Sequence, residues 1–156
     1  MPKSWSEKLK DAKGLPRVEE ICGPHKTKYG KGTMLIPAPL EVDEIMRKVP
    51  RGKLITINEI RSLLATKHGA TITCPITTGI FAWIAAYAAD EAASGGRKRI
   101  TPYWRTLKTG GHVNAKYPGG ALKLRKLLEA EGHRVVARGK HLVVDDFEKS
   151  LAKLSV

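Results

Sequence analysis

Two cysteines and one histidine are the side chains whose spacing most directly suggests chemistry in this sequence. Cys22 and His25 have the spacing of a pair of metal ligands, but a zinc site needs further ligands at recognisable spacing, and the sequence offers none. Cys74 precedes Pro75 at the expected start of a helix, where the helix dipole lowers the pKa of a thiol. A lone cysteine is more often a small buried apolar group. We therefore expect no metal and no other cofactor, and a reactive Cys74 remains an alternative.

Positive charge is the strongest signal in the composition. The 156 residues include 28 Lys and Arg against 15 Asp and Glu, which gives a net charge of +13. Residues 97–128 alone contain nine basic side chains and no carboxylate. Because a solvated surface normally mixes both signs, this run favours contact with a polyanion. Nucleic acid is the simplest such partner, and an anionic membrane surface is the weaker alternative.

Apolar content and cysteine usage indicate the class of protein. Apolar residues make up 42% of the chain, which is enough for a folded core. The longest apolar stretch, residues 76–89, is too short to span a bilayer, and residues 1–14 lack the apolar segment of a signal peptide. The two cysteines lie far apart and form no C-x-x-C pair. We expect a cytoplasmic, nucleoid-associated protein that does not enter membranes.

Local signals place the elements that must position the chemistry-bearing side chains. Apolar residues at helical spacing predict helices over residues 41–49, 57–68, 75–91 and 121–131. Thr56 and Glu59 form a capping box before the second helix, and Pro75 suits the first turn of the third. The other predicted elements are a small wing at Gly110-Gly111, a hairpin around residues 138–140 and a short helix from Asp145.

These elements predict an α+β, winged-helix-like domain over residues 41–156. Residues 1–40 are punctuated by glycine and proline and contain Lys26, Lys28 and Lys31. We interpret them as a basic N-terminal extension, an extended arm that leads into one strand at residues 34–36.

Five short motifs occur in order between residues 49 and 134. They are 49–56 (VPRGKLIT) with Glu59-Ile60, Thr78-Gly79, 102–105 (PYWR), 117–120 (YPGG) and 127–132 (LLEAEG). Together they resemble the C-terminal DNA-binding domain of the alkylguanine-DNA alkyltransferases, also called methylated-DNA–protein cysteine methyltransferases, and their alkyltransferase-like relatives. That family reads I-P-x-G-x-V-x-[ST], V-G, P-C-H-R, Y-S-G-G and L-L-x-x-E-G. Each motif alone is weak, but five in this order at near-family spacing are specific, and they cover a little over half the chain.

The departures from the family pattern fall on its reactive residues. In the family a cysteine thiolate accepts the alkyl group and is activated through a neighbouring histidine, a water and a glutamate. Here Tyr103 and Trp104 stand at the first two positions, and only Glu131 matches. A phenol with a pKa near 10 and no adjacent base is a poor alkyl acceptor. The resemblance therefore implies the alkyltransferase-like branch that lacks the acceptor cysteine, with no catalytic residue and no enzymatic activity.

The resemblance also implies which residues contact DNA. Ile57 replaces a tyrosine that helps to rotate the target nucleotide, and Ile76 replaces an arginine that fills the gap left by a flipped base. An aliphatic wedge still unstacks a base step, so docking is expected while base flipping stays open. Small residues suit close approach of the 75–91 helix to the minor groove, although a buried core helix is the alternative. The expected DNA contacts are Thr56, Ile57, Ile76, Thr78, Gly79, Arg97, Lys98, Arg99, Arg105 and Lys108.

A lesion pocket is expected at Tyr103, Trp104, Tyr117, Pro118 and Gly119, where Pro118 replaces the serine of the family. Tyr103 either lines the pocket and stacks on a base or plugs the vacated pocket, and Trp104 either stacks or packs in the core. Arg105 has two interpretations as well, a phosphate contact or an ion pair with Glu131.

The sequence thus predicts a non-enzymatic protein that binds double-stranded DNA and recognises alkylated or distorted bases for DNA repair. We expect a monomer whose further partners are excision-repair proteins. Two alternatives remain: an active alkyl transferase that uses Cys74, and a general winged-helix nucleic-acid binder without lesion preference.

Overall fold

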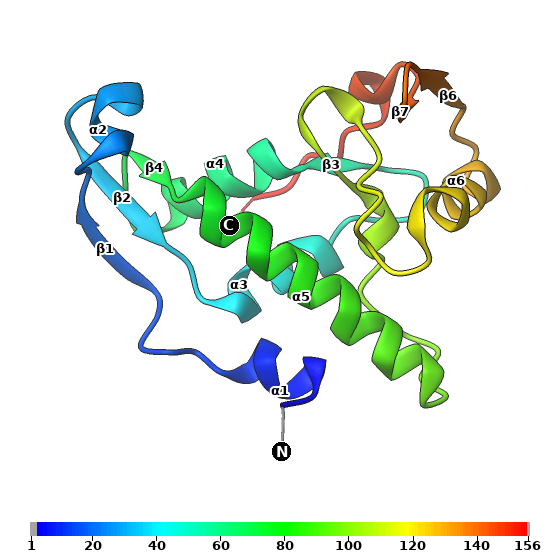
Figure 1. Cartoon of the computed structure of the whole chain (residues 1–156), viewed down its shortest axis with the longest axis horizontal. Helices are drawn as coiled ribbons and strands as arrows, with labels where there is room; N and C mark the ends of the chain where they lie inside the picture. The colour runs from blue at the N-terminus through cyan, green and yellow to red at the C-terminus, as the bar shows by residue number, and fades with distance from the viewer. Residues whose placement is uncertain (1–2, 156) are drawn as a thin grey trace.

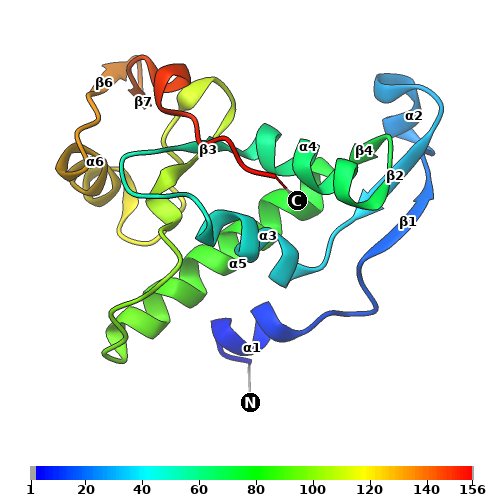
Figure 2. The same cartoon turned by 180° about the vertical axis from the view of Figure 1, so that it is seen from behind.

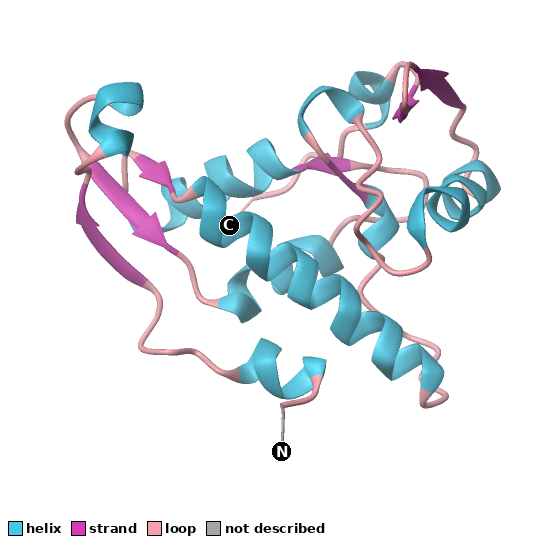
Figure 3. Cartoon of the chain, viewed as in Figure 1, coloured by secondary structure: helices cyan, strands magenta, loops and turns pink. Residues whose placement is uncertain are grey.

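Short local signals mark where the elements of this chain begin and end. A computed structural model describes residues 3–155 and has the α+β fold that the sequence predicts (Figures 1 and 3). Its α-helices are α1 (Trp5–Lys10), α2 (Pro24–Tyr29), α3 (Pro39–Arg47), α4 (Ile57–His68), α5 (Pro75–Ser94) and α6 (Gly120–Ala130). Its strands are β1 (Arg17–Glu20), β2 (Thr33–Ile36), β3 (Ile55–Thr56), β4 (Ile72–Thr73), β5 (Thr106–Leu107), β6 (Val135–Arg138) and β7 (His141–Val144). Short 3-10 helices are η1 (Tyr103–Arg105), η2 (Thr109–Gly111) and η3 (Phe147–Ser150).

The predicted helix boundaries are confirmed where a cap specifies them. The hydroxyl of Thr56 accepts from the backbone N–H of Glu59, and the carboxylate of Glu59 accepts from the N–H of Thr56 at 2.9 Å, which completes the capping box of α4. Gly69 ends α4 in the left-handed conformation, with φ of 65°. Pro75 begins α5 as predicted, since its missing N–H costs nothing in the first turn.

Helix α5 crosses the molecule, and α1 and α3 pack against it (Figures 1 and 2). Five of its alanines, including Ala82, Ala85 and Ala86, are buried. The expectation that these small residues approach DNA is therefore wrong, because α1 and α3 need the same close approach. Gly79 of the same helix is exposed.

The first 40 residues are more structured than the extended arm that the sequence predicts. β2 confirms the predicted strand, and it pairs antiparallel with β1 and parallel with β4. In α1, the backbone N–H groups of Trp5 and Ser6 donate to the Glu91 carboxylate at 3.1 and 3.2 Å. The Trp5 ring also lies 4.9 Å from the ring of Trp83 on α5. Such distant partners leave no local sequence signal, and the domain boundary at residue 40 stays a prediction.

Short strands and 3-10 turns complete the fold beside α5 and α6. β3 and β5 pair in parallel, and β6 and β7 form the predicted hairpin. The predicted wing at Gly110-Gly111 is instead the compact turn η2, because Gly111 has φ of 82° and packs directly against Phe147. The predicted C-terminal helix is the 3-10 turn η3 rather than an α-helix. Within residues 3–155, no helix has the length and apolar character needed to cross a membrane.

Candidate nucleic-acid interface

A groove lies between α5, from Ile76 to Tyr87, and the loop that joins η2 to α6. Its larger cavity, of about 780 Å³, is lined by Ile76, Gly79 and Ile80 from α5 and by loop residues that include Lys116. A second cavity of about 460 Å³ continues past Ile57 and Pro75 and shares Gly79, Lys108, Asn114 and Tyr117 with the first. We call the two cavities together the α5 groove.

Large apolar side chains project from α5 into this groove without being covered. Ile76 is 64% exposed and Ile80 is 47% exposed, although neighbouring Phe81 is buried in the core. The two isoleucines are four residues apart, so they lie on one face of the helix. An exposed apolar pair that lines a groove is a candidate contact surface for a partner.

Gly79 lies between the two isoleucines in the sequence and lines both cavities of the groove. A Cβ atom built on Gly79 meets no other atom within 4 Å. Glycine in a helix interior costs about 0.5–1 kcal/mol relative to alanine, and here no packing contact requires it. The missing side chain therefore serves access to the α5 backbone rather than the stability of the fold.

The charged groups at the groove are cations. Lys108 lines both cavities and Lys116 lines the larger one, and both side chains are exposed. His112 and His141 line the smaller cavity, with ring centroids 5.7 Å apart. Among the described residues, neither cavity is lined by a carboxylate. The groove thus combines positive charge with apolar surface.

Arg97, Lys98 and Arg99 are exposed but do not line this groove. They follow the C-terminus of α5, whereas Ile76 is in its first turn. At 1.5 Å per residue, the helix separates Ile76 from Ser94 by about 27 Å. Tyr87, the groove residue nearest to them in the sequence, comes ten residues before Arg97, and contact of these three side chains with DNA stays a prediction.

Thr56 and Thr78, both expected to contact DNA, are buried. Thr56 is 5% exposed and caps α4, and Thr78 is fully buried. The hydroxyl of Thr78 donates to the backbone oxygen of Cys74 at 2.7 Å. Their roles in this structure are to hold the ends of α4 and α5, whereas Ile57, which follows Thr56, does line the groove.

The expected lesion pocket is only partly formed. Tyr117 and Gly119 line the α5 groove, but Tyr103 is 2% exposed and, with Trp104 and Pro118, lies outside the groove lining. The Tyr103 ring packs edge-on against Trp104 at 5.4 Å and Tyr117 at 6.3 Å between centroids. This placement agrees with the interpretation of Tyr103 as a plug.

Burial also decides the protonation of the two tyrosines. It raises the pKa of Tyr103 above its usual range, although the nearby Lys123 opposes the shift. Burial raises the pKa of Tyr117 further still. Both phenols therefore stay protonated at neutral pH and are poor nucleophiles.

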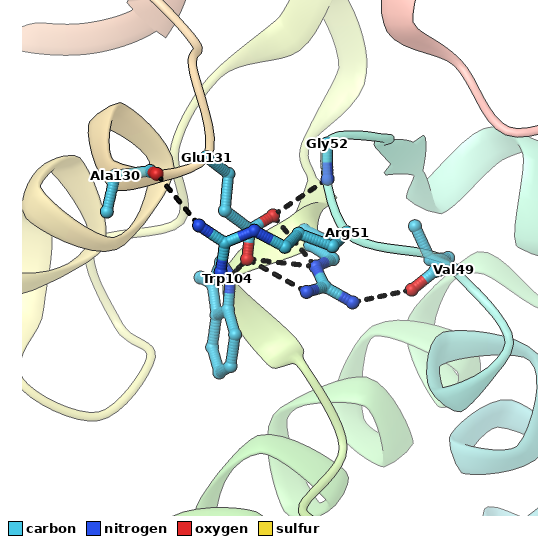
Figure 4. A network of polar contacts seen from close by, with 7 residues as sticks. Val49, Arg51, Gly52, Trp104, Ala130 and Glu131 are labelled. Atoms are coloured by element: carbon cyan, nitrogen blue, oxygen red, sulfur yellow. Dashed lines mark hydrogen bonds and ion pairs between the residues drawn. The ribbon is translucent and has the colours of Figure 1, made fainter.

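Glu131 sits at the centre of a hydrogen-bond network that we call the Glu131 network (Figure 4). Its carboxylate accepts from Trp104 Nε1 at 2.8 Å, from Arg105 at 2.9 Å and from the backbone N–H of Gly52 at 3.2 Å. Arg105 also donates to the carbonyl of Val49 at 2.7 Å. The Glu131 and Arg105 side chains are only 4% and 13% exposed. The ion pair that was one interpretation of Arg105 is thus present.

The Glu131 carboxylate is held in its charged form. Burial alone would raise its pKa, but hydrogen bonds from Arg105, Trp104 and Gly52 outweigh burial and lower the pKa below the usual value. With these hydrogen bonds and a lowered pKa, this carboxylate is a weak base toward a nearby nucleophile. It ties η1 and the loop before β3 to the end of α6.

The cysteines lie away from the groove. Cys74 is 7% exposed and packs with Ile21 and Met34 in a small second core. Cys22 is exposed, but among residues 3–155 no three His, Cys, Asp or Glu side chains are placed to hold a metal ion. The Cys22 and His25 spacing therefore forms no metal site in this structure.

Several groove residues were not predicted from the sequence. Ile80, Asn114, Lys116 and His141 line the groove but belong to no family motif. Lys116 falls in the acid-free run of residues 97–128, which is the one sequence signal that indicates it. The exposure of Ile80 depends on which face of α5 the protein covers.

No family model and no curated protein matches this chain. Among solved structures, S. pombe Atl1 in complex with damaged DNA containing O6-carboxymethylguanine is 17% identical, covers 74% of this chain and 94% of its own, and has a TM-score of 0.49. S. pombe ATL in complex with DNA is also 17% identical with the same coverage and a TM-score of 0.46. Similarity at this level leaves the function to be inferred from the residues of the site.

Proposed function

We propose that this protein binds double-stranded DNA through the α5 groove and recognises a modified or distorted base without removing the modification. The observation that carries the proposal is the exposure of Ile76 and Ile80 on either side of Gly79, in a groove whose charged lining is cationic. A duplex offers the matching partner surface, since phosphates surround apolar base faces.

Ile76 acts as a wedge in this proposal. It projects from the first turn of α5, and an aliphatic side chain inserted at a base step partly unstacks it. Unstacking costs least where the base is already damaged or mismatched, which gives lesion preference without any covalent step. Gly79 supports the wedge because the α5 backbone can then approach the DNA closely.

The protein's own side chains leave the modification in place. The buried Tyr103 phenol stays protonated, and the Glu131 carboxylate is fully engaged by Arg105 and Trp104. Cys74 packs away from the groove, so nothing in the geometry supports the alternative of a relocated acceptor. A nucleophile needs an adjacent base to accept an alkyl group, and this site supplies neither partner.

The motif resemblance supports membership of the alkyltransferase-like branch, with residues 41–156 as the DNA-binding domain. In this role the protein acts as a cytoplasmic monomer that marks damaged sites for excision-repair proteins. Retention of the lesion gives it a signalling role rather than a repair activity of its own.

Paired binding measurements test the proposal. Two duplexes of one sequence, with guanine or O6-methylguanine at the centre, are titrated with the protein at a stated salt concentration. We expect tighter binding to the modified duplex and an unchanged intact protein mass after prolonged incubation. Equal affinities would support a general nucleic-acid binder, and a mass increase equal to the alkyl group would show that the protein is a transferase.

A further inference from the structure

The surface that carries the α5 groove continues along α4 to the N-terminal segment. Asn58 and Arg61 are three residues apart and share a face of α4. At one end of this face, Asn58 Nδ2 donates to the hydroxyl of Thr109 at 3.1 Å, next to Lys108 of the groove. At the other end, the Arg61 guanidinium lies 5.9 Å from the ring of Tyr29 on α2. Polar side chains on one face of α4 therefore connect the groove to α2.

The N-terminal end of this surface carries lysines without carboxylates. Lys26, Lys28 and Lys31 are exposed, and residues 21–40 contain no Asp or Glu. None of the three forms an ion pair with a residue that the structure describes, whereas Lys67 and Lys123 elsewhere do. Charges left unpaired in this way are available to an anionic partner.

Tyr29 is where the charges of α2 and α4 converge. Lys28 Nζ lies 5.3 Å from the Tyr29 ring centroid, on α2 itself, and Arg61 approaches the same ring from α4. Although burial acts in the opposite direction, hydrogen bonds and the charges of Arg61 and Lys28 lower the pKa of the Tyr29 phenol. The local potential therefore favours a negative group beside this hydroxyl.

The fold fixes this patch relative to the groove. β2, which follows α2, pairs in parallel with β4, with Leu35 opposite Thr73. β4 leads directly into α5, and Arg61 Nε donates to the carbonyl of Thr73 at 3.0 Å. A rigid partner that occupies the groove therefore meets α2 at a constant position.

We propose that Lys26, Lys28, Lys31, Tyr29 and Arg61 form a second contact surface that grips the phosphate backbone of the same duplex beside the α5 groove. This inference rests on the proposed function and assigns a role to the N-terminal segment. Duplex DNA carries one charge per ~1.7 Å of its axis, so a surface that extends the groove along α4 and α2 reaches further phosphates. Its contacts are independent of sequence and of the lesion.

A matched pair of triple variants tests this surface. The variant Lys26→Ala/Lys28→Ala/Lys31→Ala removes the proposed contacts, and Lys48→Ala/Lys149→Ala/Lys153→Ala removes the same charge from exposed lysines beside α3 and η3. Figure 2 shows that α3 and the C-terminal segment lie on the side away from the viewer of Figure 1. Binding of both variants and of the wild type is measured on the guanine and O6-methylguanine duplexes over a range of salt concentrations.

We expect the first variant to reduce the slope of log K against log salt concentration by about 2 to 3, since each phosphate contact contributes about 0.9. Its ratio of affinities for the two duplexes should match the wild type, because the groove reads the lesion. The control variant should keep the wild-type slope, and thermal unfolding of both should be unchanged.

Failure of the proposed function and failure of the second contact surface give different results. If the wild type binds neither duplex, or if its affinity does not depend on the salt concentration, the proposed function itself fails. If the wild type binds but both triple variants lose slope equally, the second surface is overturned and the groove is retained. If the first variant lost the preference for the modified duplex, the assignment of lesion recognition to the α5 groove alone would also be contradicted.

Discussion

The α5 groove and the Glu131 network each contain residues of the family-like motifs, yet several side chains of the groove are exposed and those of the network are paired. In the groove, the side chains of Ile76 and Lys108 are exposed to solvent. In the network, the carboxylate of Glu131 and the guanidinium of Arg105 are buried and paired with each other. A surface whose groups lack partners can bind, whereas a network whose groups are already paired stabilises the fold.

This difference explains how residues of a motif that resembles a reactive one can serve the fold. Glu131 stands at the position of the family's relay glutamate, but its carboxylate accepts hydrogen bonds from Arg105 and Trp104. Trp104 in turn offers only an N–H donor and cannot accept a proton. The difference between the two regions can be tested by changing one residue at a time in each.

The largest expected effect comes from Glu131→Ala. It leaves the Arg105 guanidinium buried without its partner, so the free energy of unfolding should fall by about 3–5 kcal/mol. Chemical denaturation of both proteins measures the loss. Glu129→Ala is the control, because Glu129 pairs with Arg125 on the exposed side of the same helix and should cost less than about 1 kcal/mol. Equal losses would remove the distinction between a buried network and a surface pair.

Should Glu131→Ala fail to fold, Glu131→Gln gives the same information through the pH dependence of stability. The folded pKa of Glu131 is lowered, so its stabilisation is present above the unfolded pKa and is lost as the pH falls through the folded value. The wild type should therefore lose stability more steeply than Glu131→Gln at acid pH, below the usual carboxyl value of 4.5. Parallel curves would show that this carboxylate is not held charged by the fold.

An intermediate effect is expected from Ile76→Ala, now on binding rather than stability. Loss of a buried isoleucine contact with DNA should cost about 1.5–2 kcal/mol of binding free energy on the modified duplex. The free energy of unfolding should change by less than about 0.5 kcal/mol, since the side chain is exposed. Leu122→Ala is the matched control, because Leu122 is a large apolar side chain that is at least as exposed, on α6 and outside the groove lining. If both substitutions weaken binding alike, Ile76 is not a wedge.

Gly79→Ala should give the smallest effects, with opposite signs for folding and binding. A methyl group at this helix position meets no neighbour, so stability should rise by about 0.5–1 kcal/mol. The same methyl group obstructs close approach of DNA and should weaken binding by about 1 kcal/mol. Thermal unfolding and duplex titration of one protein preparation measure both. A gain in stability with unchanged affinity would exclude contact between DNA and this part of α5.

The sequence predicted the parts of the fold that local chemistry specifies. Thr56 and Glu59 predicted the start of α4, Pro75 predicted α5, and the β6–β7 hairpin lies around Gly139 as expected. Helix α1 was not predicted, because six residues form no stable helix alone and its N–H groups depend on Glu91, more than 80 residues away.

The residues of the candidate site divide in the same way. Ile57, Ile76, Gly79, Lys108, Tyr117 and Gly119 were expected from the sequence and lie at the groove. Thr78 and Tyr103 were expected there too but are buried, because motif spacing gives the position of a residue along α5 or η1 and not the direction of its side chain.

The sequence by itself determined the charge of this protein, most of its helices and the absence of a cysteine beside Trp104, because composition and local caps need no distant partner. Only the tertiary structure decided that α1 and α3 cover the alanine face of α5 and leave Ile76 and Gly79 open. The tertiary structure likewise joined Glu131 to Arg105 and brought Lys28 close to Arg61. Burial and pairing depend on residues that meet only when the chain is folded, so no local pattern specifies them.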